Sequence, residues 1–228
     1  FHSYMNWNFV NYNCEERVGF ITLNRPEKRN AINAQFVSEL KEAFTHAKKD
    51  TDCKVIVLKA KGDAFCAGAD LAYLQELQSN SYDENLADST HLMELFKQIY
   101  TLPKLVIAQV QGHAIAGGCG LASVCDLAIA STESKFGYSE VKIGFIPSIV
   151  SVFLIKQIGV AKSKELLLTG KIVSAEQAQS FGLINKVSTK ENLESCVMDI
   201  AQSLVKTASA DSLALTKQLI NGVSDKSI

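Results

Sequence analysis

The sequence predicts an α/β fold with mostly parallel strands. Short runs made mostly of apolar residues recur at positions 55–58, 105–110 and 127–130, and such runs are typical of strands buried on both faces of a sheet. The segments between them are long and often show helical spacing, and parallel strands need long connections of this kind. Buried strands that alternate with helical connections place the chain in the α/β class.

The first hundred residues give a strand pair, a helix, a buried strand and a second helix. Residues 9–23 are predicted to form two strands around a turn at residues 15–17. Residues 35–49 are predicted to form a helix, because their apolar residues share one face. That face comprises Phe36, Val37, Leu40, Ala43, Phe44 and Ala47. After the strand at 55–58, helical spacing returns over residues 86–99, through Leu86, Leu92, Met93, Phe96 and Ile99.

The second half repeats the alternation of strands and helices. Gly117 is expected to open a helix over residues 118–124, between the strands at 105–110 and 127–130. Ser174 and Gln177 have the spacing of a capping box, and Gly182 stands where the helix after them should end. A late strand is expected over residues 183–187, and the pattern from Lys190 onward is helical.

Composition excludes several classes of protein. The chain has 228 residues, of which 47% are hydrophobic, and 23 Lys and Arg balance 24 Asp and Glu. This is a globular composition, and a nucleic-acid-binding module would carry a basic stripe. No run approaches the length of a membrane span, and residues 1–6 do not look like a signal peptide. The six cysteines show no CxxC pattern or zinc spacing, so we expect reduced thiols, no metal and a cytoplasmic location.

Two segments rich in glycine and alanine, residues 62–71 and 112–120, follow buried strands. Neither has the spacing of a dinucleotide-binding or phosphate-binding loop. Small residues let backbone N–H groups approach a ligand, and the first turn of a helix leaves its N–H groups unpaired. Two such groups aimed at one point would form an oxyanion hole. Gly117 would open a helix, and Ala69 lies at the turn into residues 71–77. The alternative is that the glycines only permit close packing of strand and helix.

Taken together, these motifs resemble the enoyl-CoA hydratase/isomerase (crotonase) superfamily. The resemblance rests on residues 23–31, 65–71, 112–126, 136–147 and 168–183, and it covers about residues 8–215. It implies a spiral of repeated ββα units over residues 1–190. The C-terminal helices from residue 191 to 228 would then pack in trimers or dimers of trimers. It also implies an acyl-CoA substrate and no separate cofactor, because coenzyme A is part of the substrate.

The resemblance assigns the site residue by residue. The N–H groups of Ala69 and Gly117 would bind the thioester oxygen, and Glu140 would be the acid–base group. The residues implied to bind the substrate and its coenzyme A are Lys28, Arg29, Ala31, Ala67, Ala69, Asp70, Leu71, Ala72, Gly117, Gly118 and Gly120. Lys28 and Arg29 would lie near the phosphates, unless they are simply solvated.

One position departs from the best-known hydratases, which use two glutamates. The first is replaced here by Gly120, so Glu140 would act alone. A single carboxyl can support hydration or the shift of a double bond. The alternative for Glu140 is a solvated carboxylate paired with Lys142. Asp126 is expected to be a structural acceptor, Asp70 to hold the turn after Ala69, and His113 to pack or to line the pocket.

A finer resemblance concerns residues 69–75, 85–88 and 146–153, which look like the bacterial methylglutaconyl-CoA hydratase branch. That branch implies hydration of 3-methylglutaconyl-CoA to 3-hydroxy-3-methylglutaryl-CoA in leucine degradation. A cation or N–H donor should then meet the distal carboxylate of the substrate. The nearest rival is a Δ3,Δ2-enoyl-CoA isomerase. Non-catalytic acyl-CoA-binding or RNA-binding relatives are further alternatives, and no residue favours a decarboxylase or dehalogenase.

Overall fold

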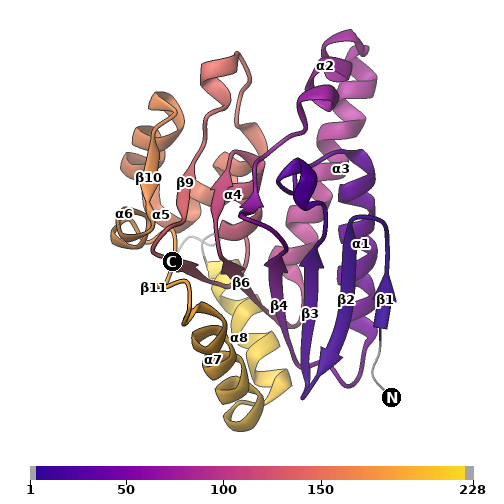
Figure 1. Cartoon of the computed structure of the whole chain (residues 1–228), viewed down its shortest axis with the longest axis vertical. Coiled ribbons are helices and arrows are strands. Elements are labelled where there is room, and N and C mark those ends of the chain that lie inside the picture. Colours follow the sequence, from indigo (N-terminus) through magenta and orange to yellow (C-terminus); the bar gives the residue numbers. More distant parts are fainter. Residues whose placement is uncertain (1–3, 224–228) are drawn as a thin grey trace.

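The computed structural model describes residues 4–223, and it confirms the α/β class. Eleven strands of the described residues form two sheets (Figure 1). The seven-stranded sheet has the order β1-β2-β3-β4-β6-β8-β11, and the four-stranded sheet has the order β10-β9-β7-β5. From β3 to β11 the larger sheet is parallel, whereas β1, β2 and β3 pair antiparallel.

The elements follow the predicted alternation. The strands are β1 (Tyr4–Asn6), β2 (Val10–Glu15), β3 (Val18–Leu23), β4 (Val55–Ala60), β5 (Ala64–Cys66), β6 (Leu105–Val110), β7 (His113–Ile115), β8 (Leu127–Ser131), β9 (Lys135–Gly137), β10 (Ile172–Ser174) and β11 (Lys186–Ser188). The helices are α1 (Ala34–Lys49), α2 (Leu71–Ser79), α3 (Tyr82–Thr101), α4 (Gly117–Ser123), α5 (Ser148–Thr169), α6 (Ala175–Ser180), α7 (Leu193–Thr207) and α8 (Ala210–Val223). Two 3₁₀ turns, η1 (Pro26–Lys28) and η2 (Glu140–Ile143), complete the set.

Successive strand pairs give one strand to each sheet. β4, β6 and β8 lie in the larger sheet, while β5, β7 and β9, which directly follow them, lie in the smaller one. Helical segments follow each pair, so the chain winds as the predicted spiral of ββα units. The smaller sheet brings β5 beside β7, and β7 beside β9, in parallel pairing. The loops that follow these three strands therefore meet at one edge, and that edge carries the site.

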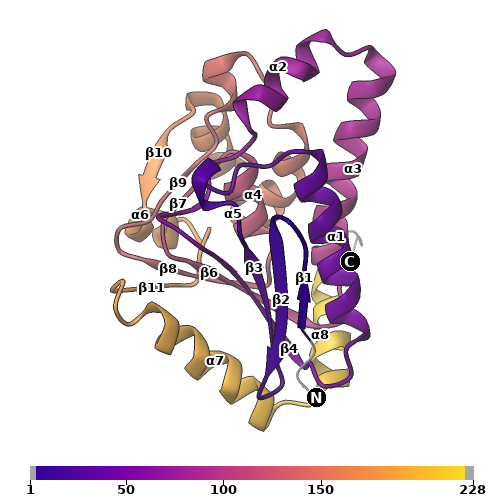
Figure 2. The ribbon, with the colours of Figure 1, turned by 45° about the vertical axis from the view of Figure 1, so that its right-hand side comes forward.

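Helices cover both faces of the larger sheet (Figure 2). On one face lie α1 and α3, and all six apolar positions predicted for α1 are buried there. On the other face lies α7, whose Leu193, Val197 and Ala201 pack against residues such as Phe20 and Val57. The last strand, β11, ends just before residue 190, where the C-terminal helical region was predicted to begin. No helix of the described residues is long and apolar enough to cross a bilayer.

Two predicted elements differ from the structure. The late strand is Lys186–Ser188 rather than 183–187, because Leu183 still closes the end of α6 through a hydrogen bond to the Ala178 carbonyl. The helix predicted over 86–99 spans Tyr82–Thr101, because Ser81 and Glu84 form a capping box that starts it earlier. The capping box predicted at Ser174 is confirmed.

Candidate active site

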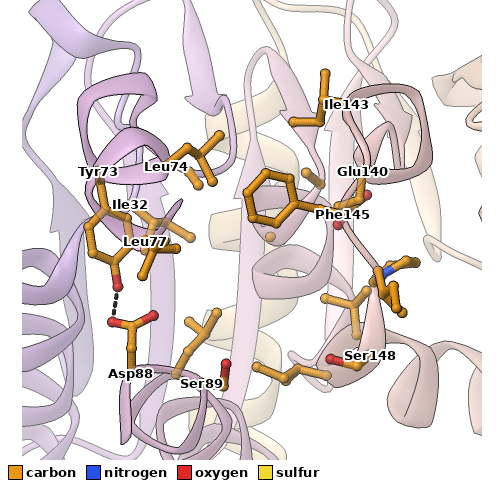
Figure 3. Close-up of a pocket in the computed structure, with 18 of the residues that line it drawn as sticks. Ile32, Tyr73, Leu74, Leu77, Asp88, Ser89, Glu140, Ile143, Phe145 and Ser148 are labelled. Atoms are coloured by element: carbon orange, nitrogen blue, oxygen red, sulfur yellow. Dashed lines mark hydrogen bonds between the residues drawn. The ribbon is translucent and has the colours of Figure 1, made fainter. Parts of the chain in front are cut away.

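A cavity of about 350 Å³ lies between the two glycine- and alanine-rich segments, the α2–α3 pair, and the loop from η2 to α5 (Figure 3). Its lining is mostly apolar, with Ile32, Leu74, Leu77 and Phe145 among the residues that contribute. The predicted site residues Ala67, Ala69, Leu71, Gly117 and Glu140 also line it. The structure therefore brings these five predicted residues, which come from separate parts of the sequence, together at one cavity.

Ala69 is held in an isolated β-bridge to Ile32. The Ile32 N–H donates to the Gly68 carbonyl at 2.7 Å, and the Asp70 N–H donates to the Ile32 carbonyl at 2.9 Å. Successive N–H groups of an extended chain point in opposite directions. The Ala69 N–H consequently points away from Ile32, and it has no protein acceptor within the described residues.

Gly117 begins α4, so its N–H has no acceptor within the helix. The residue before it, Ala116, has φ 53° and ψ −125°, a conformation that non-glycine residues rarely adopt. The Ala116 N–H donates to the Gly137 carbonyl at 2.7 Å, which fixes this strained turn to β9. Strain of this kind persists where the surrounding structure imposes it. It lies directly before Gly117, which lines the cavity.

The two segments pack directly on each other. A Cβ atom placed on Gly68 would lie 3.0 Å from the Cβ of Ala116. One placed on Gly118 would lie 2.2 Å from the Cys66 carbonyl oxygen. Close packing therefore requires glycine in both segments. This requirement is compatible with a role for the glycines in packing alone and with a role in presenting N–H groups to a ligand. The contact keeps the Ala69 and Gly117 amides on the same wall of the cavity.

Glu140 stands at the start of η2 on another side of the cavity, and Figure 3 shows its side chain beside Phe145. The side chain is half-buried, and its Oε2 atom is shielded from solvent without a hydrogen-bond partner among the described residues. Burial raises the pKa of this carboxyl, opposed only by a backbone hydrogen bond. The alternative of a freely solvated carboxylate does not fit this burial. A carboxyl group with a raised pKa in a cavity suits proton transfer.

The opposite end of the cavity is polar. The Tyr73 hydroxyl donates to the Asp88 carboxylate, Ser89 lies beside Asp88, and Ser148 lies across the cavity from them (Figure 3). Burial raises the pKa of Asp88, against the opposing charge of His91. None of these residues was predicted as part of the site. The spacing of Tyr73, Leu74 and Leu77 could have indicated that one face of α2 lines a pocket, but nothing in the sequence placed that face opposite Ser148.

Other predicted substrate-binding residues lie around the cavity but do not line it. Lys28 and Arg29 are exposed at η1, and the Arg29 carbonyl accepts a hydrogen bond from the Ala67 N–H at 3.0 Å. Ala31 is buried and Ala72 is exposed. Their contacts with coenzyme A stay predictions.

Gly118 and Gly120 are buried behind the cavity wall. A Cβ atom on Gly120 would lie 2.4 Å from Val150 Cγ1 and 3.0 Å from Phe96 Cε2. The structure therefore gives both glycines a packing role. Their predicted contact with the substrate remains a prediction.

Three further interpretations can be compared with the structure. Asp70 caps α2 by accepting from the Ala72 N–H at 3.0 Å, as expected. Asp126 accepts from the Val106 N–H and from Lys217 Nζ, which fits a structural acceptor. His113 was expected to pack or to line the pocket, and this was wrong. It is exposed on the short strand β7, because the neighbouring Ala114 takes the buried face.

Two other kinds of chemistry receive no support at this site. Cys66 and Cys119 lie close to the cavity wall, but burial raises the pKa of each thiol to about 12, which is unfavourable for a nucleophile. Within residues 4–223, no group of three or more His, Cys, Asp and Glu side chains is arranged to hold a metal ion.

Comparison with known proteins identifies the family of this chain. The sequence profile of the enoyl-CoA hydratase/isomerase family matches residues 13–228. An enoyl-CoA hydratase homologue of Thermus thermophilus is 40% identical over 203 residues, covering 89% of this chain and 80% of the relative. The crotonyl-CoA hydratase of Syntrophomonas wolfei is 36% identical, covering 82% and 72%. The crystal structure of an enoyl-CoA hydratase from Mycobacterium smegmatis superposes with a TM-score of 0.91 at 32% identity, covering 97% of this chain and 86% of that one. The chain belongs to the enoyl-CoA hydratase/isomerase family.

Proposed function

We propose that this protein hydrates an α,β-unsaturated acyl-CoA thioester with Glu140 as its single acid–base group. The observation that carries the proposal is the half-buried Glu140 carboxyl on the same cavity as Ala69 and Gly117. The Oε2 atom of Glu140 and the N–H groups of Ala69 and Gly117 have no hydrogen-bond partner among the described residues. Water addition to a conjugated thioester passes through an enolate-like state in which negative charge builds on the carbonyl oxygen. Fixed N–H donors stabilise such charge, each by about 3 kcal/mol.

The proposed reaction balances with one carboxyl group. Ionised Glu140 takes a proton from water as the water oxygen bonds to the β-carbon. The π electrons move onto the thioester oxygen, where the Ala69 and Gly117 amides receive the charge. Glu140 then returns the same proton to the α-carbon, which restores the carbonyl and the ionised carboxylate. The net change is the addition of one water molecule.

Replacing the proposed acid–base group tests this reaction. We expect Glu140→Gln to lower kcat for crotonyl-CoA by about 10³-fold, because general acid–base catalysis has this magnitude. The Kd for butyryl-CoA should change little, since the amides remain. Glu133→Gln is the matched control, because Glu133 is exposed and, among the described residues, forms an ion pair with Lys190. Wild-type activity in Glu140→Gln would refute the role of Glu140.

The same carboxyl predicts a pH dependence. Glu140 must be ionised to act as a base, and burial raises its pKa above the ordinary glutamate value of about 4.3. We therefore expect kcat/KM to rise with pH along an acid limb whose midpoint lies above that value. Steady-state rates from acid to neutral pH measure this limb, and Glu140→Gln should lack it.

We also propose 3-methylglutaconyl-CoA as the substrate, on the resemblance of residues 69–75, 85–88 and 146–153. No Lys, Arg or His among residues 4–223 lines the cavity, so the distal carboxylate would meet Ser89, Ser148 and Asp88 instead. Asp88 could donate a hydrogen bond to that carboxylate only while protonated, and burial favours its protonated form. The preference for this substrate over crotonyl-CoA should therefore weaken as pH rises, and Asp88→Asn should remove this dependence.

Rates with a panel of substrates test the proposed reaction and the proposed acyl group separately. We expect 3-methylglutaconyl-CoA to give a higher kcat/KM than crotonyl-CoA, with little conversion of 3-hexenoyl-CoA to a conjugated product. A preference for crotonyl-CoA would remove the finer substrate and leave the hydratase intact. Efficient conjugation of 3-hexenoyl-CoA without hydration would instead identify an isomerase.

The proposed assembly is a homotrimer or a dimer of trimers, in keeping with the family resemblance. Leu215, Leu219 and Ile220 of α8 are each more than 60% exposed, which suits contact with another subunit. Sedimentation equilibrium should give three or six chains per particle. A monomer at micromolar concentration would contradict the proposal.

A further inference from the structure

Arg25 is a buried arginine beside the first glycine- and alanine-rich segment, and the proposed reaction leaves it without a role. It is 8% exposed. Its Nη2 lies 2.7 Å from Asp70 Oδ2, its Nη1 donates to the Ala31 carbonyl at 2.9 Å, and its guanidinium stacks 4.9 Å from the centre of the Phe9 ring. All three contacts fix the guanidinium group within the core rather than toward solvent.

The backbone of Arg25 is held as firmly as its side chain. Its N–H donates to Asn30 Oδ1 at 2.8 Å, and its carbonyl accepts from the Asn30 N–H at 2.9 Å. Asn30 is fully buried, and its amide nitrogen donates to the carbonyls of Lys61 and Ala64. Arg25 is therefore linked through Asn30 to the start of the first segment, and through Asp70 to its end.

Asp70 connects Arg25 to the Ala69 amide. Its Oδ1 caps α2 through the Ala72 N–H, and its Oδ2 faces Arg25. Its own N–H closes the bridge to Ile32 that turns the Ala69 N–H away from Ile32, and Ala69 lines the cavity. A displacement of Asp70 would therefore rotate the peptide group next to Ala69.

The charge of Asp70 also bears on the reaction. The Asp70 side chain is one residue away from the amide that would receive a developing negative charge. An unpaired carboxylate at that position would oppose this charge, and the low exposure of the pair would leave the repulsion poorly screened. The guanidinium of Arg25 neutralises the carboxylate.

We propose that Arg25 is a positioning residue for the reaction: it holds Asp70 in place and cancels its charge, so that the Ala69 amide can stabilise the thioester oxyanion. This inference rests on the proposed hydratase function. Arg25 does not line the cavity, so its effect passes through Asp70 and Ala69.

Steady-state kinetics of paired variants test the inference. We expect Arg25→Met to lower kcat for crotonyl-CoA by up to about 10²-fold, as a misplaced group does, with KM changed only a few-fold. Arg25→Lys should recover part of kcat. Asp70→Asn keeps a good helix cap and should lower kcat less than Arg25→Met does.

The double variant separates charge cancellation from a purely structural role. Arg25→Met combined with Asp70→Asn leaves no unpaired carboxylate, so we expect its kcat to exceed that of Arg25→Met several-fold. If Arg25 were only structural, the second substitution would add to the loss, and that result would overturn the proposal. Lys41→Met is the matched control, because it breaks the ion pair with Glu94 between α1 and α3, away from the site.

Infrared difference spectra of bound, isotope-labelled butyryl-CoA report directly on the oxyanion hole. We expect the thioester carbonyl band to shift to lower frequency on binding to the wild type, and to shift less with Arg25→Met. An equal shift in both proteins would overturn the role of Arg25. No shift in the wild type would instead count against the proposed oxyanion hole itself. Thermal unfolding and the Kd for butyryl-CoA identify a variant that has failed to fold, and Arg25→Lys then carries the test.

Discussion

The two glycine- and alanine-rich segments each bring one backbone amide to the same cavity, but different forces orient the two amides. In residues 62–71, the Ala69 amide is set by a bridge to Ile32 and by the Arg25–Asp70 ion pair. In residues 112–120, the Gly117 amide is set by the strained turn at Ala116 and by glycines pressed against Cys66. The first arrangement depends on charged side chains, whereas the second depends on the absence of side chains.

This difference determines how each segment should fail. A segment held by charges can lose function while remaining folded, and its stability responds to pH. A segment held by steric fit should lose stability when a single methyl group is added, with little dependence on pH. Four experiments test this difference between the charge-held and the sterically held segment, in order of decreasing expected effect.

The largest effect is expected for Gly120→Glu, in the helix of the second segment. A Cβ at this position would lie 2.4 Å from Val150 Cγ1, and the new carboxylate would be buried. Overpacking and an unpaired buried charge together should lower the free energy of unfolding by about 4 kcal/mol. Activity should not rise, although the change would supply the first glutamate of the two-glutamate pattern that Gly120 replaces. Chemical unfolding and rates with 3-methylglutaconyl-CoA measure both effects, and a several-fold gain in rate would contradict the prediction.

The next effect is expected for Gly118→Ala, which adds one methyl group between the segments. The new Cβ would lie 2.2 Å from the Cys66 carbonyl oxygen, a backbone atom that cannot move independently. We expect a loss of about 3 kcal/mol in the free energy of unfolding. Gly222→Ala in α8 is the matched control, because nothing lies within 4 Å of its Cβ. If both variants had equal stability, the steric account of the second segment would fail.

A smaller effect is expected for Gly68→Ala, in the first segment. Gly68 has φ +90°, and its Cβ would lie 3.0 Å from both the Ala116 Cβ and the Ile115 carbonyl oxygen. Positive φ alone should cost about 1–2 kcal/mol, and the neighbouring atoms can shift by a few tenths of an ångström. Chemical denaturation measures the loss. A loss larger than that of Gly118→Ala would show that steric fit governs the first segment as well.

The smallest effect concerns how Asp70 and Glu140 make the free energy of unfolding depend on pH. Burial alone would raise the pKa of Asp70, but the hydrogen bonds from Arg25 and Ala72 and the charge of Arg25 outweigh it, so the pKa is lowered. Asp70 therefore stabilises the fold at pH values above the ordinary carboxyl pKa, and this contribution is lost as the pH falls through the lowered pKa. Burial raises the pKa of Glu140, so its ionisation destabilises the fold as pH rises through the ordinary value.

The two carboxyl groups should therefore contribute slopes of opposite sign to the plot of unfolding free energy against pH. Unfolding free energies of the wild type, Asp70→Asn and Glu140→Gln, measured between about pH 3 and pH 7, provide the comparison. Relative to the wild type, Asp70→Asn should lose stability as pH rises, and Glu140→Gln should gain it. Slopes of the same sign would show that the ion pair with Arg25 does not govern Asp70.

Much of the fold could be predicted from local patterns. The apolar face of α1, the buried strands β4, β6 and β8 and the capping box at Ser174 each follow from spacing within one element. Boundaries were less predictable where tertiary contacts set them. Leu183 has the apolar character of a strand residue, yet it closes a helix. His113 follows a buried strand, yet it faces solvent.

The sequence by itself determined the ββα repeat, the family and the three groups proposed for the chemistry, Ala69, Gly117 and Glu140. The family resemblance assigned these three groups, and its motifs can be identified because each is a short run of residues within one segment of the chain. Only the tertiary structure decided that Arg25 pairs with Asp70, that Tyr73 meets Asp88 in the cavity, and that Gly120 has no room for a side chain. Each of these contacts joins residues that lie on different elements, and nothing in a local pattern specifies which distant side chain fills the space beside it.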